Sequence, residues 1–303
     1  MLADTAVLTL TNNGLKKAVL LLLNSETFGM LSGNGEAGFS AGTSTTIGSA
    51  NESGAFSGTI GRFTGSVTKN GTGTWDLTGA NILSGGGNGP TINVNDGIVK
   101  VGGDLSAVIA MVNSGGTLMG TGSLDSGFIN SGGTLAIGNS PGCLTFSSLT
   151  LASGANYNQD ITGTAACTGY DKATVTGAVD LAGATLNIAQ LAGFSPAAGT
   201  VLTIVDGASV TGTFAGLANG AVFAVNGVNY RINYTATGEV TLTVVAASVR
   251  PTATTPSTTT TLASTGNNAG VITLVSLALV SGAALTVAAN RTRLVRAWQR
   301  TRR

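Results

Sequence analysis

VNSGGTLMGTGSLD, residues 112–125, recurs with small changes as VNDGIVKVGGDLS at 94–106 and as INSGGTLAIGNSPG at 129–142. In each copy a β-branched residue precedes an asparagine, a glycine-containing turn follows, and a short apolar strand comes next. The asparagines Asn95, Asn113 and Asn130 are therefore spaced by 18 and 17 residues. A repeat this short forms one rung of a stack and not a domain of its own.

The repeat predicts a right-handed parallel β-helix, in which each rung buries its inward side chains by stacking on the next rung. Asparagines at one register would then form a ladder in which the side-chain amides bond between rungs. Three unrelated turns in a β-sandwich are the alternative, because asparagine–glycine turns are common there too.

The composition also favours an all-β fold. The 303 residues include 46 glycines and no histidine, and only 9% of the chain is charged and 5% aromatic. Hydrophobic residues still make up 43%, which argues against a disordered chain. Gly, Thr, Ser, Asn and Val suit many short strands joined by tight turns. Basic residues cluster at the C-terminus instead of covering a face with stacking aromatics, so we expect no nucleic-acid partner.

The sequence divides into five segments. Residues 1–39 contain Lys16, Lys17 and the apolar run 18–23, which together suggest an incomplete or degenerate secretion signal. Residues 40–170 form the β-helix repeat region. Residues 171–249 have longer alternating strands and a hairpin turn at VNGVNY (225–230), and these predict an antiparallel β cap. A Thr/Pro-rich linker (250–261) and a C-terminal segment (262–303) follow.

The C-terminal segment predicts one transmembrane helix. Residues 269–289 contain no charged residue, and at about 1.5 Å per residue a helix of this length spans about 30 Å, the thickness of the bilayer core. Arg291, Arg293 and Arg296 follow at once, as in a stop-transfer segment whose basic flank stays in the cytoplasm. The body would then lie outside the cell. A buried helix of a globular domain is the alternative.

The two cysteines, Cys143 and Cys167, lie 24 residues apart and without the CxxC spacing of many metal sites. In an extracellular body we expect them to form a disulfide, and two buried free thiols are the alternative. No histidine is available to complete a metal site, so we expect neither a metal nor a cofactor.

Residues 47–103 resemble the autotransporter-associated β-strand repeat. The residues that match this pattern are Phe56, Ser57, Gly58, Ile60, Lys69, Gly71, Gly73, Thr74, Leu77, Gly79, Asn81, Gly85 and Gly97. Trp75 and the pair Ile82-Leu83 depart from it. Residues 210–245 are similar to a module often found after such repeats in secreted bacterial proteins. The resemblance implies a passenger-type β-helix of a surface protein and carries little information about activity.

Residues 262–303 resemble a Gram-positive cell-wall sorting signal. Leu262, Ala263, Ser264, Thr265 and Gly266 form an LAxTG variant of the LPxTG motif, directly before the apolar run and the arginines. The resemblance implies a sortase that cleaves after Thr265 and joins it to a peptidoglycan precursor. A single-span membrane protein, in which this motif is ordinary linker sequence, is the alternative.

An enzymatic role is not expected, and a β-helix enzyme that acts on a polysaccharide is the less favoured alternative. Without histidine there is no Ser-His or Cys-His nucleophile pair. Four aspartates lie in or near the repeats, but nothing in their spacing places two across a sugar-sized gap, so we interpret them as turn residues. These are Asp76, Asp96, Asp104 and Asp125. Trp75 is expected to fill a rung from inside, and an exposed position where it stacks on a sugar is the alternative. The sequence thus predicts a structural or adhesin-like surface protein, whose ligand on a host or neighbouring cell it does not identify.

Overall fold

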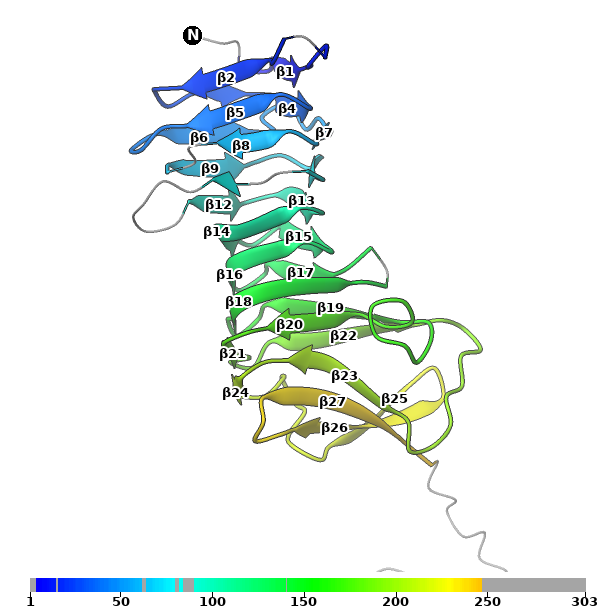
Figure 1. The fold of residues 1–303 in the computed structure, drawn as a ribbon. Coiled ribbons are helices and arrows are strands. Elements are labelled where there is room, and N and C mark those ends of the chain that lie inside the picture. Colours follow the sequence, from blue (N-terminus) through cyan, green and yellow to red (C-terminus); the bar gives the residue numbers. More distant parts are fainter. Residues whose placement is uncertain are drawn as a thin grey trace, which may run out of the picture. The chain divides into compact units, whose positions relative to one another are not determined.

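The protein is described from a computed structural model, which covers residues 4–14, 16–61, 64–79, 82–83, 90–139 and 141–246. Over these residues the fold is all-β, built mainly from parallel sheets, and contains no helix. Figure 1 shows the strands stacked in chain order from β1 at one end to β23, and at the other end β27 lies between β23 and β26. This is the β-helix-like arrangement that the repeat predicts, and it is not a β-sandwich.

The chain winds into a β-helix-like stack of turns, which we call the coil. Each turn contributes one strand to the first sheet, in which all neighbouring strands are parallel. Its members, in spatial order, are β1 (Val7–Leu10), β4 (Met30–Gly33), β7 (Gly54–Phe56), β10 (Thr74–Leu77), β13 (Gly97–Val101), β15 (Gly116–Gly120), β17 (Thr134–Ile137), β19 (Asn156–Ile161) and β22 (Thr185–Gln190).

Two further sheets close the coil. The second consists of β2 (Val19–Leu22), β5 (Glu36–Phe39), β8 (Thr59–Gly61) and β11 (Ile82–Leu83). The third runs through β3 (Thr27–Phe28), β6 (Ser44–Ile47), β9 (Ser66–Lys69), β12 (Thr91–Val94), β14 (Asp104–Val112), β16 (Ser123–Ile129), β18 (Cys143–Leu151), β20 (Lys172–Val175), β23 (Val201–Asp206), β27 (Glu239–Val245), β26 (Val228–Tyr234) and β25 (Val222–Val225). A branch of β21 (Ala178–Asp180) and β24 (Ser209–Thr211) leaves it at β18.

From β14 onward one long strand per turn replaces the two short strands that earlier turns contribute to the second and third sheets. The second half of β14 pairs with β12, while β14 also contacts β11 of the second sheet. A register shift between Leu105 and Ile109 bends the strand where the corner would be. The two halves of β18 separate again, with Cys143–Phe146 pairing with β20 and Leu149–Thr150 with β21. The long strands therefore continue both sides of the coil.

Side chains alternate between the core and the solvent, and the inward ones stack from rung to rung. One inward row on the first sheet contains Leu31, Trp75, Val99, Leu118, Leu135 and Tyr157, each at most 1% exposed. Trp75 fills its rung as predicted, and its indole N–H donates to the Leu31 carbonyl at 3.2 Å. Burying each large aliphatic side chain contributes about 1.5–3 kcal/mol.

The predicted asparagine ladder is confirmed. The Asn113 side-chain amide donates to the Asn95 side-chain carbonyl at 2.7 Å, and Asn130 donates to Asn113 at the same distance. The ladder has a fourth member, because Asn95 donates to Asn70 at 3.1 Å. The repeat pattern in the sequence does not include Asn70, because a lysine precedes it where the other copies have a β-branched residue.

The parallel part is longer than the expected segment 40–170. Strands before residue 40 already belong to the coil, and β2, within the suggested secretion signal, pairs in parallel with β5. After residue 170, β20, β21 and β22 still pair in parallel with earlier strands, and β23 pairs in parallel with β20. Antiparallel pairing begins where β27 meets β23 and continues through β26 and β25. The antiparallel cap thus occupies only the last part of the expected segment 171–249.

The predicted hairpin turn joins β25 to β26. Val225 pairs with Val228, and Asn226 and Gly227 between them have φ angles of 46° and 83°. Two successive positive φ angles are typical of the tight hairpin turn whose twist matches the flanking strands. No helix capable of spanning a membrane occurs within the described part of the chain, and the expected span 269–289 lies outside that part.

Candidate functional site

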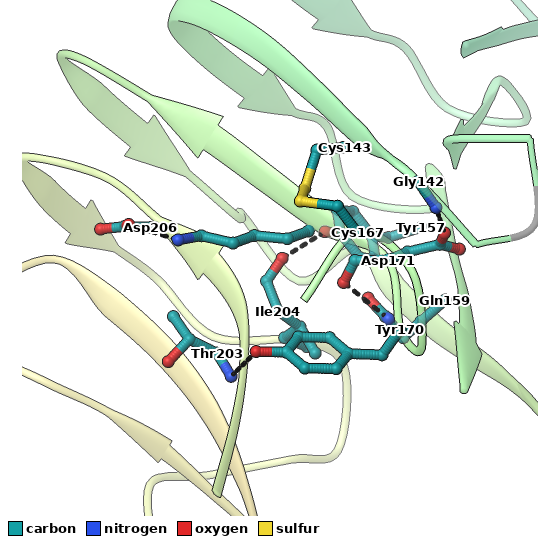
Figure 2. The surroundings of a disulfide bond; sticks show 11 residues. Gly142, Cys143, Tyr157, Gln159, Cys167, Tyr170, Asp171, Thr203, Ile204 and Asp206 are labelled. Atoms are coloured by element: carbon teal, nitrogen blue, oxygen red, sulfur yellow. Dashed lines mark hydrogen bonds and ion pairs between the residues drawn. A yellow bond between two sulfur atoms is a disulfide. The ribbon is translucent and has the colours of Figure 1, made fainter. Parts of the chain in front are cut away.

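The two cysteines form a disulfide near the middle of the chain (Figure 2). Cys143 is the first residue of β18, and Cys167 lies in the loop between β19 and β20, with their Cα atoms 4.9 Å apart. Cys167 has a φ of 66°, and its backbone N–H donates to the Tyr170 carbonyl at 2.8 Å. The cross-link holds the loop 162–171 against the start of β18.

Asp171 ends this loop and is buried, with 1% of its surface exposed. One carboxylate oxygen accepts the backbone N–H of Gly142 at 2.7 Å, and the other accepts that of Asp160 at 2.8 Å. Burial raises the pKa of Asp171 to about 6, although these two hydrogen bonds favour the ionised form. The Asp171 side chain therefore connects three segments: Gly142 just before β18, strand β19, and the loop closed by the disulfide (Figure 2).

Three further buried polar side chains surround Asp171 (Figure 2). Gln159 donates to the Asp171 carbonyl at 2.8 Å, and its own carbonyl oxygen has no partner among the described residues. The Tyr157 hydroxyl donates to the Ile204 carbonyl at 2.8 Å, and burial raises the pKa of that hydroxyl. The Tyr170 hydroxyl accepts the Thr203 N–H at 3.3 Å. The Tyr170 bond joins the loop to β23, the Tyr157 bond joins β19 to β23, and the Gln159 bond joins β19 to the end of the loop.

A second polar position lies inside the coil. Lys69 is fully buried in an inward row between Ile47 and Val94. Its ammonium donates to the carbonyls of Asn70 and Gly71, both at 2.7 Å. Burial lowers the pKa of Lys69, and the negative charge of Asp96 partly opposes this. The matching lysine of the repeat pattern thus bonds to the turn that follows it.

The four aspartates considered as catalytic pairs bind to different neighbours. Asp76 forms an ion pair with Lys100 at 3.1 Å, and the Asp96 carboxylate accepts its neighbour's backbone N–H at 2.8 Å. The Asp104 carboxylate accepts the Ser106 N–H and the Ser123 hydroxyl, which lower the pKa of Asp104. Asp125 accepts the Ser126 hydroxyl at 3.2 Å. Each carboxylate is thus held by contacts in its own turn or with an adjacent rung.

The outward face of the third sheet carries two in-register rows of side chains. The first row is Ser44, Ser66, Thr91, Ile109, Ser126 and Ser148. The second row is Thr46, Thr68, Asn93, Met111, Phe128 and Thr150. None of these residues is charged. We call this surface the neutral face. The repeat pattern in the sequence does not reveal it, because the outward residues vary between rungs.

The remaining predicted site residues lie outside the described residues. They are the sorting motif Leu262, Ala263, Ser264, Thr265 and Gly266 and the stop-transfer residues Arg291, Arg293 and Arg296. Among the side chains that are described, no group of three His, Cys, Asp or Glu residues could hold a metal ion.

Comparison with known proteins assigns no family to this chain. No family model matches it. No curated protein sequence matches it either.

Proposed function

We propose that this protein is a bacterial cell-surface rod, anchored through its C-terminus and covalently linked to peptidoglycan by a sortase. The observation that carries the proposal is the uninterrupted stack of strands from β1 to β24, cross-linked by the Cys143–Cys167 disulfide. Each rung adds about 4.8 Å to the stack, so repeated rungs supply length. A rod of this kind serves as a spacer or as an adhesin-like support.

The disulfide supports a location outside the cytoplasm. Structural disulfides persist in oxidising compartments and are rare where thioredoxin and glutathione keep thiols reduced. The bond also closes a loop with a sequence separation of 24 residues, whose ends would otherwise be free to separate. The body before residue 250 would therefore be exported.

The anchoring part of the proposal rests on the order of sequence features. A Thr/Pro-rich linker, the LASTG motif, an uncharged run and an arginine-rich tail follow the body in the order that a sorting signal requires. The run 269–289 would hold the chain in the membrane until Thr265 is transferred to the peptidoglycan precursor. A right-handed coil is part of the proposal, because connections between parallel strands of one sheet are right-handed in about 98% of cases.

Mass spectrometry of the muramidase-solubilised wall fraction tests the sortase step. We expect the chain to end at Thr265 and to carry a peptidoglycan fragment. The Thr265→Ala variant should instead remain in the membrane fraction with its C-terminus intact, whereas Thr261→Ala in the linker should be processed normally. An intact C-terminus through Arg303 in the wild-type protein, extracted by detergent alone, would show a membrane-anchored protein that no sortase processes.

A further inference from the structure

The two cysteines of the disulfide differ in how far solvent reaches them. Cys167 is exposed, as are all of residues 164–168 around it, whereas Cys143 is half-buried between the buried Gly142 and Leu144. We propose that the coil folds with both thiols reduced and is then oxidised by a disulfide-bearing thiol oxidant that exchanges with Cys167. Asp171 is the positioning residue that holds Cys143 in reach of Cys167 for the closing step.

The loop that carries Cys167 is ordered by hydrogen bonds that do not involve sulfur. The Cys167 N–H donates to the Tyr170 carbonyl at 2.8 Å. The N–H groups of Thr162 and Gly163 both donate to the Gly169 carbonyl, at 2.7 and 2.6 Å. These bonds close the loop on itself, so Cys167 has a defined place in the folded chain before any cross-link exists.

Cys143 is held from the other side by the same segment (Figure 2). The Asp171 carboxylate, at the end of the loop, accepts the Gly142 N–H at 2.7 Å, and the Lys172 N–H donates to the Gly142 carbonyl at 3.0 Å. Cys143 itself pairs with Lys172 in the parallel register of β18 and β20. The residue before one cysteine is thus bound to the segment that follows the other, and their Cα atoms lie 4.9 Å apart. In the folded coil hydrogen bonds bring the cysteines together, and the disulfide restricts the unfolded chain.

The reaction needs an oxidant because two thiols lose two electrons. The Cys167 thiolate attacks one sulfur of the oxidant's disulfide, so a mixed disulfide forms and the oxidant's other sulfur leaves as a thiolate. The Cys143 thiolate then attacks the Cys167 sulfur, which forms the protein disulfide and releases the oxidant's second thiolate. The two protons of the cysteines end on the two thiols of the reduced oxidant. Access decides which sulfur reacts first, and access favours Cys167.

This inference rests on the proposed function only for the place where the oxidant acts, outside the cytoplasm. The measurements use the purified full chain in a neutral detergent, with oxidised glutathione as the oxidant. The reduced wild-type protein should have the circular dichroism spectrum of the oxidised one at room temperature. An unfolded reduced chain would overturn the inference, because oxidation would then have to precede folding.

Single-cysteine variants test which sulfur exchanges. In Cys143→Ser, the remaining Cys167 should form its mixed disulfide with glutathione about tenfold faster than Cys143 does in Cys167→Ser, as followed by mass spectrometry. In concentrated urea the two rates should become similar, because the difference comes from burial in the fold. Equal rates in the folded variants, or faster reaction of Cys143, would overturn the assignment. This comparison does not depend on whether a variant of Asp171 folds.

The closing step tests Asp171. In the otherwise unchanged chain, Asp171→Asn should slow the conversion of the mixed disulfide to the protein disulfide about tenfold, because an amide cannot accept both N–H groups in the same way. Its first step should keep the wild-type rate. Lys69→Met is the matched control, since it removes the bonds of another buried charged group, on β9, and should change neither step.

A closing rate unaffected by Asp171→Asn, or slowed equally by Lys69→Met, would show that Asp171 does not position the cysteines. Failure of sortase processing would leave all of these rates unchanged, so the two proposals are tested separately.

Discussion

The side-chain amide of Asn113 lies between two others, donating to Asn95 at 2.7 Å and accepting from Asn130 at 2.7 Å. Asn130, by contrast, donates to Asn113 but has Ala152 as its counterpart on the next rung, where Ala152 donates its N–H to the Ile129 carbonyl. The ladder therefore has two inner members, Asn95 and Asn113, with two amide–amide bonds each, and two end members, Asn70 and Asn130, with one each.

Asn113→Ala should destabilise the protein more than Asn130→Ala. A hydrogen bond contributes about 0.5–1.5 kcal/mol, so the inner substitution should cost about twice as much as the one at the end. Denaturant unfolding followed by circular dichroism measures both. Equal losses of unfolding free energy would show that the amides do not act as a ladder.

Removing the disulfide should lower the unfolding free energy by about 3 kcal/mol, because the cross-link limits the unfolded chain. Cys143→Ser, Cys167→Ser and the double variant should all lose the same amount, since each removes the same bond. Thermal unfolding with and without reductant provides the measurement. A wild-type protein whose melting temperature is unaffected by reductant would contradict the prediction.

Stability should fall as the pH rises from about 4 to 7 because of Asp171. Its pKa of about 6 in the folded protein exceeds the ordinary value of 3.8, so the unfolded chain releases this proton first. The stabilising contribution is complete below pH 3.8 and is lost as the pH passes 6, an effect on the order of 1–3 kcal/mol.

Asp171→Asn should remove this pH dependence. Asp104→Asn is the control, because the pKa of Asp104 is lowered and its contribution changes only at more acidic pH. The measurement is the unfolding free energy between pH 4 and pH 7. An Asp171→Asn variant that keeps the wild-type slope would show that another group is responsible.

Lys69→Met should destabilise the protein by about 1–3 kcal/mol, because the carbonyls of Asn70 and Gly71 lose their donor. Lys100→Met is the matched control on the surface: it breaks the ion pair with Asp76 and should cost at most about 1 kcal/mol. Denaturant titrations of both variants would decide. A Lys69→Met protein as stable as the wild type would mean that apolar packing compensates for the lost bonds.

Gly48→Ala should be far more harmful than Gly42→Ala. Both glycines have positive φ angles, 85° and 75°, which cost an alanine roughly 1–2 kcal/mol. At Gly48 the added Cβ would also lie 2.1 Å from the Asn70 carbonyl oxygen on the next rung, whereas Gly42 faces open space. We expect a total of about 3 kcal/mol or more for Gly48→Ala, measured by thermal unfolding. Similar losses at both positions would exclude a steric contribution from the neighbouring rung.

The sequence could predict the coil where its rungs resemble one another. Asn95, Asn113 and Asn130 revealed the stacking register, and the inward position of Trp75 followed from its size. The extent of the coil could not be predicted in the same way. Alternation of apolar residues indicates a strand but does not distinguish parallel from antiparallel pairing. The sequence therefore predicts antiparallel pairing for β20 and β22, whereas both pair in parallel with earlier strands.

The polar interior was not predictable from local patterns. Lys69 occupies a position where its neighbours in the row are Ile47 and Val94. The carbonyls of Asn70 and Gly71 in its own turn, and the carbonyl of Asp96 on the next rung, make a buried cation tolerable there. The surroundings of Asp171 depend on segments that meet only in the folded coil: Gly142, Asp160 and the loop held by Cys167. Such contacts have no signature in a single stretch of sequence.

The in-register stacking of the first sheet also bears on how a protein of this kind can change in length. Leu118 and Leu135 occupy equivalent places on successive rungs, so excision of the intervening 17-residue period would shorten the coil by one step, about 4.8 Å, and leave every later strand in phase. The length that can be removed depends on the rung, since Val99 and Leu118 are equivalent at a separation of 19 residues. In-frame recombination between neighbouring repeats therefore has a structurally permitted unit, and the gene can vary the reach of the protein in whole rungs.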